Sequence, residues 1–317
     1  MFSLIKYLQG LKERLQRNKG LWFTTITTIS VLGIIITMYI IMSMTSNVSQ
    51  KVYSSMSKEY HVSIENFLES KKGEFQKVAL SLAQNTPLLQ SIENNDQQSL
   101  IEFDKSFNEL LAKNGMNNYV VTIYAIANKE EILRTSVVSV VQSKNSVYGF
   151  EVMADGVFNV YLQPLIKDDK VYGVIELKES IHNYRQYFEG LNDEYVFLLD
   201  KKMLPKISID AKNGRYKDMI GDLSVEKTFY DTKFTASIPE LEEEQFAQMK
   251  LDGYIIDNIY YRTYKNVVDI NGANIGMIVT GEIIDKEDGF VNLADNMTKT
   301  ITTVALGLVI SIMLFMF

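Results

Sequence analysis

The sequence has no cysteine, only two histidines and only four prolines among its 317 residues. The lack of cysteine excludes disulfide frameworks, thiolate metal sites and thiol nucleophiles, and it leaves the redox compartment open. His61 and His182 have no partner at the spacing of a catalytic triad or a metal motif, so both are expected at the surface. No glycine-rich phosphate loop follows a predicted strand either. The sequence therefore predicts no enzyme, no metal site and no cofactor.

Basic residues are also in the minority. The formal net charge is −7, with 32 Lys and Arg against 39 Asp and Glu. Binding to nucleic acid depends on clustered Lys and Arg, so nucleic acid is excluded as an expected partner. The 46% hydrophobic and 22% charged composition is typical of a chain that folds around cores.

Two long uncharged segments predict membrane helices. Leu21–Met44 has 24 residues without a charge, enough to cross the ~30 Å hydrocarbon layer. Five basic residues and one acid precede it, so the N-terminus is expected in the cytoplasm and the following residues outside. Thr300–Phe317 is a second, shorter candidate. Because the chain stops inside it, we expect a fragment whose output domain is missing; a complete protein with a short C-terminal anchor remains the alternative.

Residues 45–90 are expected to form one long amphipathic helix. Apolar residues recur there three or four positions apart, with polar residues between them. This stripe could pack on the chain's own domain or pair with a second copy. Pro87 marks a boundary, and a second amphipathic helix is predicted at Leu100–Leu111.

After residue 118 the pattern changes to short β-type runs that occur in two similar series. The first series predicts strands at 119–127, 147–152, 157–165 and 171–177, with helices at 130–142 and 179–189. The second predicts strands at 194–202, 253–263, 264–270 and 275–284, with helices near 224–230 and from 239. Asp155-Gly156 and Asn271-Gly272 supply hairpin turns, so both series are expected to contain antiparallel meanders. The acidic run from Glu240 to Glu244 is expected to be solvated helix, because adjacent positions point in different directions.

The order of these segments resembles the double Cache sensor domain of bacterial chemoreceptors and sensor histidine kinases. The most specific stretch is GFEVMADGVFNVYLQPLIKDDKVYGVIELKESI at residues 149–181. It is similar to the core of the family's first module at Gly149-Phe150-Glu151, Gly156, Pro164-Leu165 and Gly173-Val174-Ile175-Glu176. The connection between Ala127 and Gly149 is shorter than the family's, and the family's amino-acid-binding motif is not recognisable, so no ligand class is carried over.

The resemblance implies an α+β fold with a long membrane-proximal helix and two tandem PAS-like modules with antiparallel sheets, flanked by two transmembrane helices. The expected boundaries are 1–20 for a cytoplasmic segment, 21–44 for the first transmembrane helix, 45–118 for the long helix and helical connection, 119–192 for a membrane-distal module, 193–285 for a membrane-proximal module, and 286–317 for a linker and the second transmembrane helix. The expected function is that of a homodimeric receptor in the cytoplasmic membrane, with residues 45–295 outside sensing a small molecule. The alternative is an adaptor ectodomain that recognises a protein partner.

A PAS-like sheet binds small molecules between its concave face and the loops over it, with polar groups inside an apolar pocket. The predicted ligand-binding residues lie on or beside the central strands of the first module: Tyr124, Arg134, Tyr148, Glu151, Asn159 and Tyr161. Of these, Tyr124, Arg134 and Tyr161 are expected to line one pocket, with Arg134 able to pair a carboxylate or phosphate bidentately. An ordinary ion pair is the alternative for Arg134, and half-buried sheet packing is the alternative for the tyrosines. In the second module, Tyr260, Arg262 and Tyr264 should share one face, expected to be the exposed side of a sheet.

Overall fold

The computed structural model describes residues 19–94, 96–126, 134–230, 232–286 and 289–316. The chain divides into two compact units: residues 56–284 carry the sheets, and residues 1–55 with 285–317 are helical where described. The predicted cytoplasmic segment falls mostly on residues 1–18, outside the described residues.

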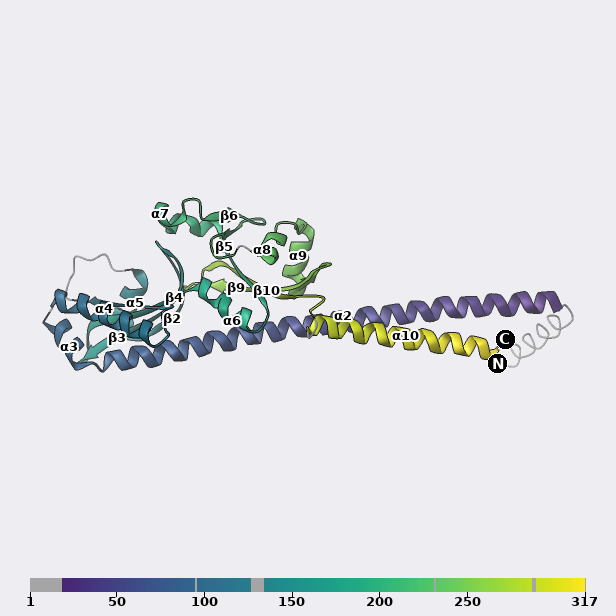
Figure 1. Ribbon diagram of the computed structural model, residues 1–317, viewed down its shortest axis with the longest axis horizontal. Coiled ribbons are helices and arrows are strands. Elements are labelled where there is room, and N and C mark those ends of the chain that lie inside the picture. The colour runs from purple at the N-terminus through teal and green to yellow at the C-terminus, as the bar shows by residue number, and fades with distance from the viewer. Residues whose placement is uncertain (1–18, 95, 127–133, 231, 287–288, 317) are drawn as a thin grey trace. The chain divides into compact units, whose positions relative to one another are not determined.

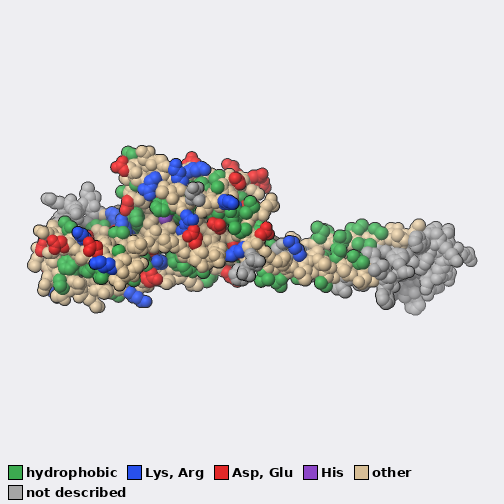
Figure 2. Space-filling view, viewed as in Figure 1, with side chains coloured by type: hydrophobic (Ala, Val, Ile, Leu, Met, Phe, Trp, Pro, Cys, Tyr) green, Lys and Arg blue, Asp and Glu red, His purple; other side chains and the backbone are tan. Residues whose placement is uncertain are grey.

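Helix α2 (Lys19–Ala83) is continuous through the first apolar segment and most of the predicted amphipathic helix (Figure 1). It is the one helix within the described residues that has a stretch long and apolar enough to cross a membrane, and none of that stretch is buried inside the protein. In the same unit, helix α10 (Phe290–Met316) brings the Thr298 hydroxyl to 3.5 Å from the Ser49 hydroxyl of α2. The described surface of the helical unit shows patches of hydrophobic side chains and few charged ones, whereas charged side chains gather on the sheet-bearing unit (Figure 2).

The predicted helix over 45–90 is interrupted. The side chain of Asn85 accepts a hydrogen bond from the amide of Leu88 at 3.0 Å, and it caps a separate helix, α3 (Thr86–Glu93). Helix α4 (Gln97–Lys113) follows, capped in the same way by Asp96. Pro87, which fits the first turn of a helix, explains why the new helix begins there.

The first sheet has four antiparallel strands in the order β1-β4-β3-β2. They are β1 (Tyr119–Ala125), β2 (Val147–Met153), β3 (Gly156–Lys167) and β4 (Lys170–Ser180). Its inner face packs against α2, α3 and α4 through Phe75, Leu88, Leu111 and their neighbours. Its outer face packs against α5 (Thr135–Ser143) through Val137 and Val140.

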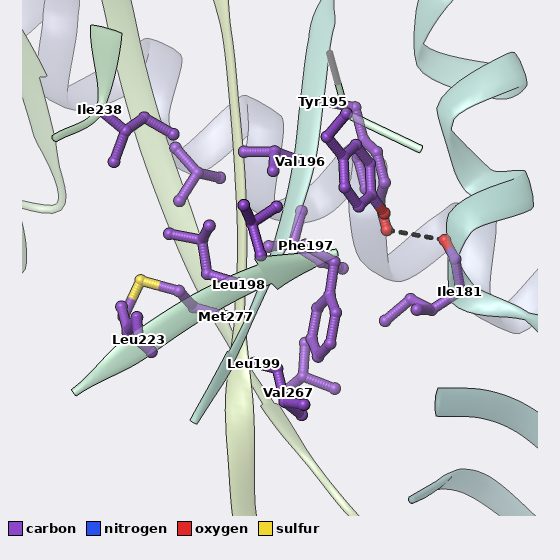
Figure 3. Packing of buried hydrophobic residues seen from close by; sticks show 14 of the residues in the cluster. Ile181, Tyr195, Val196, Phe197, Leu198, Leu199, Leu223, Ile238, Val267 and Met277 are labelled. Atoms are coloured by element: carbon purple, nitrogen blue, oxygen red, sulfur yellow. Dashed lines mark hydrogen bonds between the residues drawn. The ribbon is translucent and has the colours of Figure 1, made fainter. Parts of the chain in front are cut away.

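The second sheet has six strands in the order β6-β7-β5-β10-β9-β8. They are β5 (Glu194–Asp200), β6 (Tyr216–Asp218), β7 (Leu223–Glu226), β8 (Tyr254–Ile256), β9 (Tyr260–Val268) and β10 (Asn274–Ile283). The surrounding short helices are η1 (Ile181–Tyr184), α6 (Arg185–Gly190), η2 (Lys201–Lys206), α7 (Ile209–Lys212), α8 (Lys233–Ser237) and α9 (Glu243–Asp252). The uniformly apolar stretch of β5 forms the centre of the core, where the Tyr195 hydroxyl donates to the Ile181 carbonyl at 3.1 Å (Figure 3).

The predicted fold class, α+β with a long helix and two antiparallel sheets, is confirmed. The helix predicted near 224–230 is wrong: residues 223–226 form strand β7, in which all four side chains are buried and Ser224 pairs with Leu199. The helix predicted at 179–189 begins only at Ile181, because β4 continues to Ser180. The predicted strand 253–263 is broken by a turn at Asp257, whose carboxylate accepts the amides of Ile259 and Tyr260, both at 2.7 Å.

Candidate functional site

A cluster of polar side chains lies on the outer face of the first sheet. We call Tyr124, Arg134, Ser136, Glu151 and Glu176 the outer cluster. The Arg134 guanidinium donates to Glu151 at 3.0 Å through Nη1 and pairs with Glu176 through Nη2. The Ser136 hydroxyl lies 3.0 and 3.1 Å from the two carboxylate oxygens of Glu151. These contacts join the start of α5 to strands β2 and β4.

Strand alternation explains why these side chains share a face. Glu176 pairs with Leu162 of β3 and Tyr124 with Val174 of β4, and both apolar partners belong to the cluster under α5. Arg134 directly precedes α5, with an extended backbone that aims its side chain back over the sheet. The sequence predicted Tyr124, Arg134 and Glu151 as neighbours in a site, and the structure brings these three together.

The outer cluster is mostly withdrawn from solvent. The Glu176 side chain is 1% exposed and that of Arg134 is 28% exposed. Burial raises the pKa of the Tyr124 hydroxyl, and the Arg134 guanidinium opposes part of that shift. One guanidinium faces two carboxylates, so the ion pair that the sequence left open as the alternative for Arg134 is present.

The other three predicted residues lie on the inner face. Tyr148 pairs directly with Tyr161 across β2 and β3, and Tyr161 packs in the cluster that faces α2. Asn159 donates through Nδ2 to the Tyr148 hydroxyl at 2.8 Å, and that hydroxyl donates to the Leu68 carbonyl of α2 at 2.7 Å. Tyr148 and Tyr161 also line a cleft of about 280 Å³ together with Lys72, Gln76 and Ser146.

The expectation that Tyr124, Arg134 and Tyr161 line one pocket is therefore wrong. Tyr161 points toward α2, whereas Tyr124 points toward α5, because their positions in β3 and β1 have opposite phases in the paired sheet. Whether any of the six residues binds a ligand stays a prediction. The sequence analysis also missed Glu176 and Ser136 as members of the site. The signal for Glu176 was a single acid inside the apolar strand VYGVIEL.

In the second module, the face carrying Tyr260, Arg262 and Tyr264 is not the exposed side of the sheet. Arg262 is fully buried, with its guanidinium paired to Asp257 and donating to the Ser237 hydroxyl at 2.7 Å. The ring centroids of Tyr260 and Phe234 lie 4.9 and 5.5 Å from its charge. Helix α8 and the turn at Asp257 cover a position that sequence alternation alone placed in solvent.

The histidines also differ from expectation. His182 is buried, with Nε2 2.7 Å from Glu226 and Nδ1 2.8 Å from the Tyr230 hydroxyl. His61 is half-buried, with Nε2 2.6 Å from the Tyr264 carbonyl oxygen. Among the described residues, no group of three His, Asp or Glu side chains is placed to hold a metal ion. The acids from Glu240 to Glu244 are exposed as expected, but α9 begins only at Glu243, so Glu240 lies in a turn and Glu242 caps the helix.

Comparison with known proteins finds no matching family model and no matching curated protein. Among solved structures, the ligand-binding domain of Mlp24 with asparagine is 13% identical at a TM-score of 0.35, covering 80% of this chain and 99% of that one. The sensor domain of the V. cholerae histidine kinase DctB is 8% identical at a TM-score of 0.37, covering 73% and 98%. The ligand-binding domain of the Pseudomonas fluorescens chemoreceptor CtaA with L-serine is 12% identical at 0.40, covering 74% and 98%.

Two of these solved structures are described as the sensor domain of a histidine kinase and the ligand-binding domain of a chemoreceptor. At these identities and TM-scores they assign neither a family nor a ligand to this chain.

Proposed function

We propose that this chain is the extracytoplasmic sensing region of a transmembrane signal-transduction receptor of the chemoreceptor or sensor-kinase type, and that it binds a small molecule. The observation that carries the proposal is the outer cluster. A guanidinium, two carboxylates, a phenol and a hydroxyl are gathered beside the apolar side chains that pack between this sheet face and α5. A few placed polar groups among apolar ones are what a small-molecule site requires.

The contacts of Arg134 determine how an anionic ligand could bind at the outer cluster. Its two terminal nitrogens each face a carboxylate, so a ligand anion would have to displace Glu151 or Glu176 from the guanidinium. Glu151, with a side chain that is 20% exposed, is the more accessible of the two. An incoming ligand would therefore exchange partners with Glu151 and alter the contact between α5 and β2.

Transmission would use helix α2, which is continuous from the apolar segment to the inner face of the first sheet. The apolar segment of α2 and helix α10 are proposed to cross the cytoplasmic membrane, with the sheets outside and two copies of the chain associating. Displacements of such helices are typically ~1–2 Å. The ligand can shift the receptor only by its difference in affinity between the two states.

A thermal unfolding screen of the full chain in lipid nanodiscs tests the proposal with amino acids, organic acids, amines and purines. A ligand at 100 times its Kd adds about 2.7 kcal/mol to the stability of the folded state. Arg134→Gln is expected to abolish the shift. Arg185→Gln is the matched control, because its side chain is similarly exposed at 34% but pairs with Glu189 outside the cluster.

The stability of each variant without ligand is measured first, so that a loss of folding is not mistaken for a loss of binding. A shift that survives Arg134→Gln would place the ligand elsewhere. No shift with any class would favour the adaptor alternative, in which the ectodomain recognises a protein.

A further inference from the structure

A second cleft, separate from the outer cluster, opens on the inner side of the first module. Its volume is about 300 Å³, and residues of α2, β4, η1 and α6 line it together with Asn118, which precedes β1. This volume is at the lower end of the range for small-molecule sites. Any occupant would touch α2 and the segment that leads from the first module to the second.

The one Lys or Arg among the residues lining this cleft already lies between two acids. Lys71 Nζ lies 3.0 Å from the Tyr119 hydroxyl, 3.1 Å from Glu179 and 3.7 Å from Glu74. The first two are hydrogen-bond distances and the third is a looser ion pair. With its charge balanced by two carboxyl groups, Lys71 is a poor anchor for an anionic ligand.

The cleft has more hydrogen-bond acceptors than the donors around it can use. Glu74 and Glu179 together offer about eight lone-pair positions, of which Lys71 and the Tyr119 hydroxyl use only a few. Burial raises the pKa of Glu179, but the ammonium of Lys71 opposes that shift and favours the ionised carboxylate. The cleft is thus lined by two carboxyl groups against a single ammonium group.

The rest of the lining suits a positively charged group. The rings of Phe67 and Tyr187 stack with centroids 4.1 Å apart, and Tyr187 is 37% exposed. The ammonium of Lys71 already lies 5.7 Å from the Phe67 ring centroid, within the range of a cation–π contact. Side-chain amides of Asn118, Asn183 and Gln186 add carbonyl oxygens that accept hydrogen bonds.

We propose that this cleft binds a small organic amine in its protonated form, with the ammonium group directed at Glu74 and Glu179 and the carbon chain against Tyr187. A bound amine would connect α2 to β4 and α6. It would therefore stabilise one position of α2 relative to the sheet, independently of a ligand at the outer cluster.

The test uses three probes with the same carbon chain and different charge: n-butylamine, n-butanol and butyrate. Binding to the full chain in nanodiscs at pH 7 is measured by isothermal titration calorimetry, with empty nanodiscs as the blank for partition into lipid. At pH 7 the amine is protonated, since alkylammonium groups titrate near 10.4. We expect saturable binding of butylammonium with a Kd at least about tenfold lower than that of either other probe.

Glu74→Gln removes the excess charge from a half-exposed position and is expected to weaken butylammonium binding about tenfold. Glu69→Gln is the control, because it makes the same change on the same helix at a more exposed residue outside the cleft. Arg134→Gln should leave amine binding unchanged, which separates this site from the outer cluster.

Three results would overturn the proposal: equal binding of butanol, equal weakening by Glu69→Gln, or no saturable binding of the amine.

Discussion

The Nε2 atom of His182 lies 2.7 Å from the Glu226 carboxylate, and both side chains are buried. His182 belongs to η1, which follows directly from the last strand of the first sheet, and Glu226 ends β7 of the second sheet. Arg215 and Tyr216 also contact the same carboxylate. The connection between the two sheets is therefore fixed by a buried network of charged and hydrogen-bonded groups.

Replacing His182 by alanine is expected to destabilise the sheet-bearing unit by about 3 kcal/mol. The substitution removes two buried hydrogen bonds and leaves a cavity beside Phe229, whose ring stacks on the imidazole at 4.2 Å. Urea unfolding of residues 56–284, followed by circular dichroism, measures the change in the free energy of unfolding. His61→Ala is the control and should cost about 1 kcal/mol or less, because it removes one hydrogen bond to a carbonyl from a half-buried site. Similar losses in the two variants would contradict the network's role.

Gly281 is expected to tolerate no side chain. It lies in β10 opposite Arg262, and an added Cβ would overlap the Tyr261 carbonyl oxygen on the neighbouring strand. Gly281→Ala should therefore force the strands apart and cost several kcal/mol, the scale of severe overpacking. A large fall in the thermal midpoint of residues 56–284 is the expected observation. Gly190→Ala makes the same change where nothing lies within 4 Å, so it should leave the midpoint nearly unaltered.

Replacing Asp104 by asparagine should stabilise the folded protein at high pH but not at low pH. Burial raises the pKa of its carboxyl to about 6, partly opposed by a hydrogen bond from the Ile123 amide. An unfolded Asp titrates near 3.9, so the raised pKa favours folding below about pH 4, and this advantage is lost as the pH rises through about 6. Asp104→Asn is therefore expected to stabilise the protein at pH 8, by about 1 kcal/mol after allowance for solvent screening. At pH 4 the gain should vanish, and unfolding curves at the two pH values test this. A gain of equal size at both values would point to a cause other than titration.

The sequence predicted the strands of the first module well, because alternating apolar residues and the Asp155-Gly156 turn are local signals. It could not predict which of the six candidate residues meet. Tyr124 and Tyr161 each lie in a clearly predicted strand, but the face that each one occupies depends on the pairings Tyr124–Val174 and Tyr161–Leu177. Pairing between distant strands sets this phase, and a shift by one residue reverses it.

Local sequence patterns could not predict which charged residues are buried, because this too depends on contacts between distant segments. Arg262 lies in the polar run YYRTY, which is typical of an exposed strand, but α8 with its Phe234 ring and the turn at Asp257 remove it from solvent. The burial of His182 was not predicted, because its partner Glu226 is 44 residues away in a segment predicted as helix. In both cases a partner from a distant segment compensates the cost of burying a polar group.

Arg262→Met should be among the most damaging substitutions on the second sheet. The guanidinium is fully buried, and its loss removes the ion pair with Asp257 and the hydrogen bond to Ser237. Breaking a buried pair typically costs 3–5 kcal/mol. We expect about 3 kcal/mol here, because Asp257 is 25% exposed and keeps the backbone amides of Ile259 and Tyr260 as donors. Urea unfolding of residues 56–284 measures the loss, and Arg185→Met, which breaks an exposed pair with Glu189, should cost about 1 kcal/mol at most.

The loss of stability of Arg262→Met in acid distinguishes the contribution of the Arg262–Asp257 ion pair from that of side-chain packing. Burial raises the pKa of Asp257, but hydrogen bonds from Tyr260, Arg262 and Ile259 outweigh it, so the pKa lies below its usual value. The stabilisation from a lowered pKa is present above the unfolded value near 3.9 and is lost as the pH falls through the folded pKa. Without Arg262 this lowering is smaller, so Arg262→Met should lose less additional stability between pH 5 and about pH 3 than the unmodified chain does. If both proteins lose the same amount over that interval, the contribution of Arg262 is packing against Tyr260 and Phe234 and not its charge.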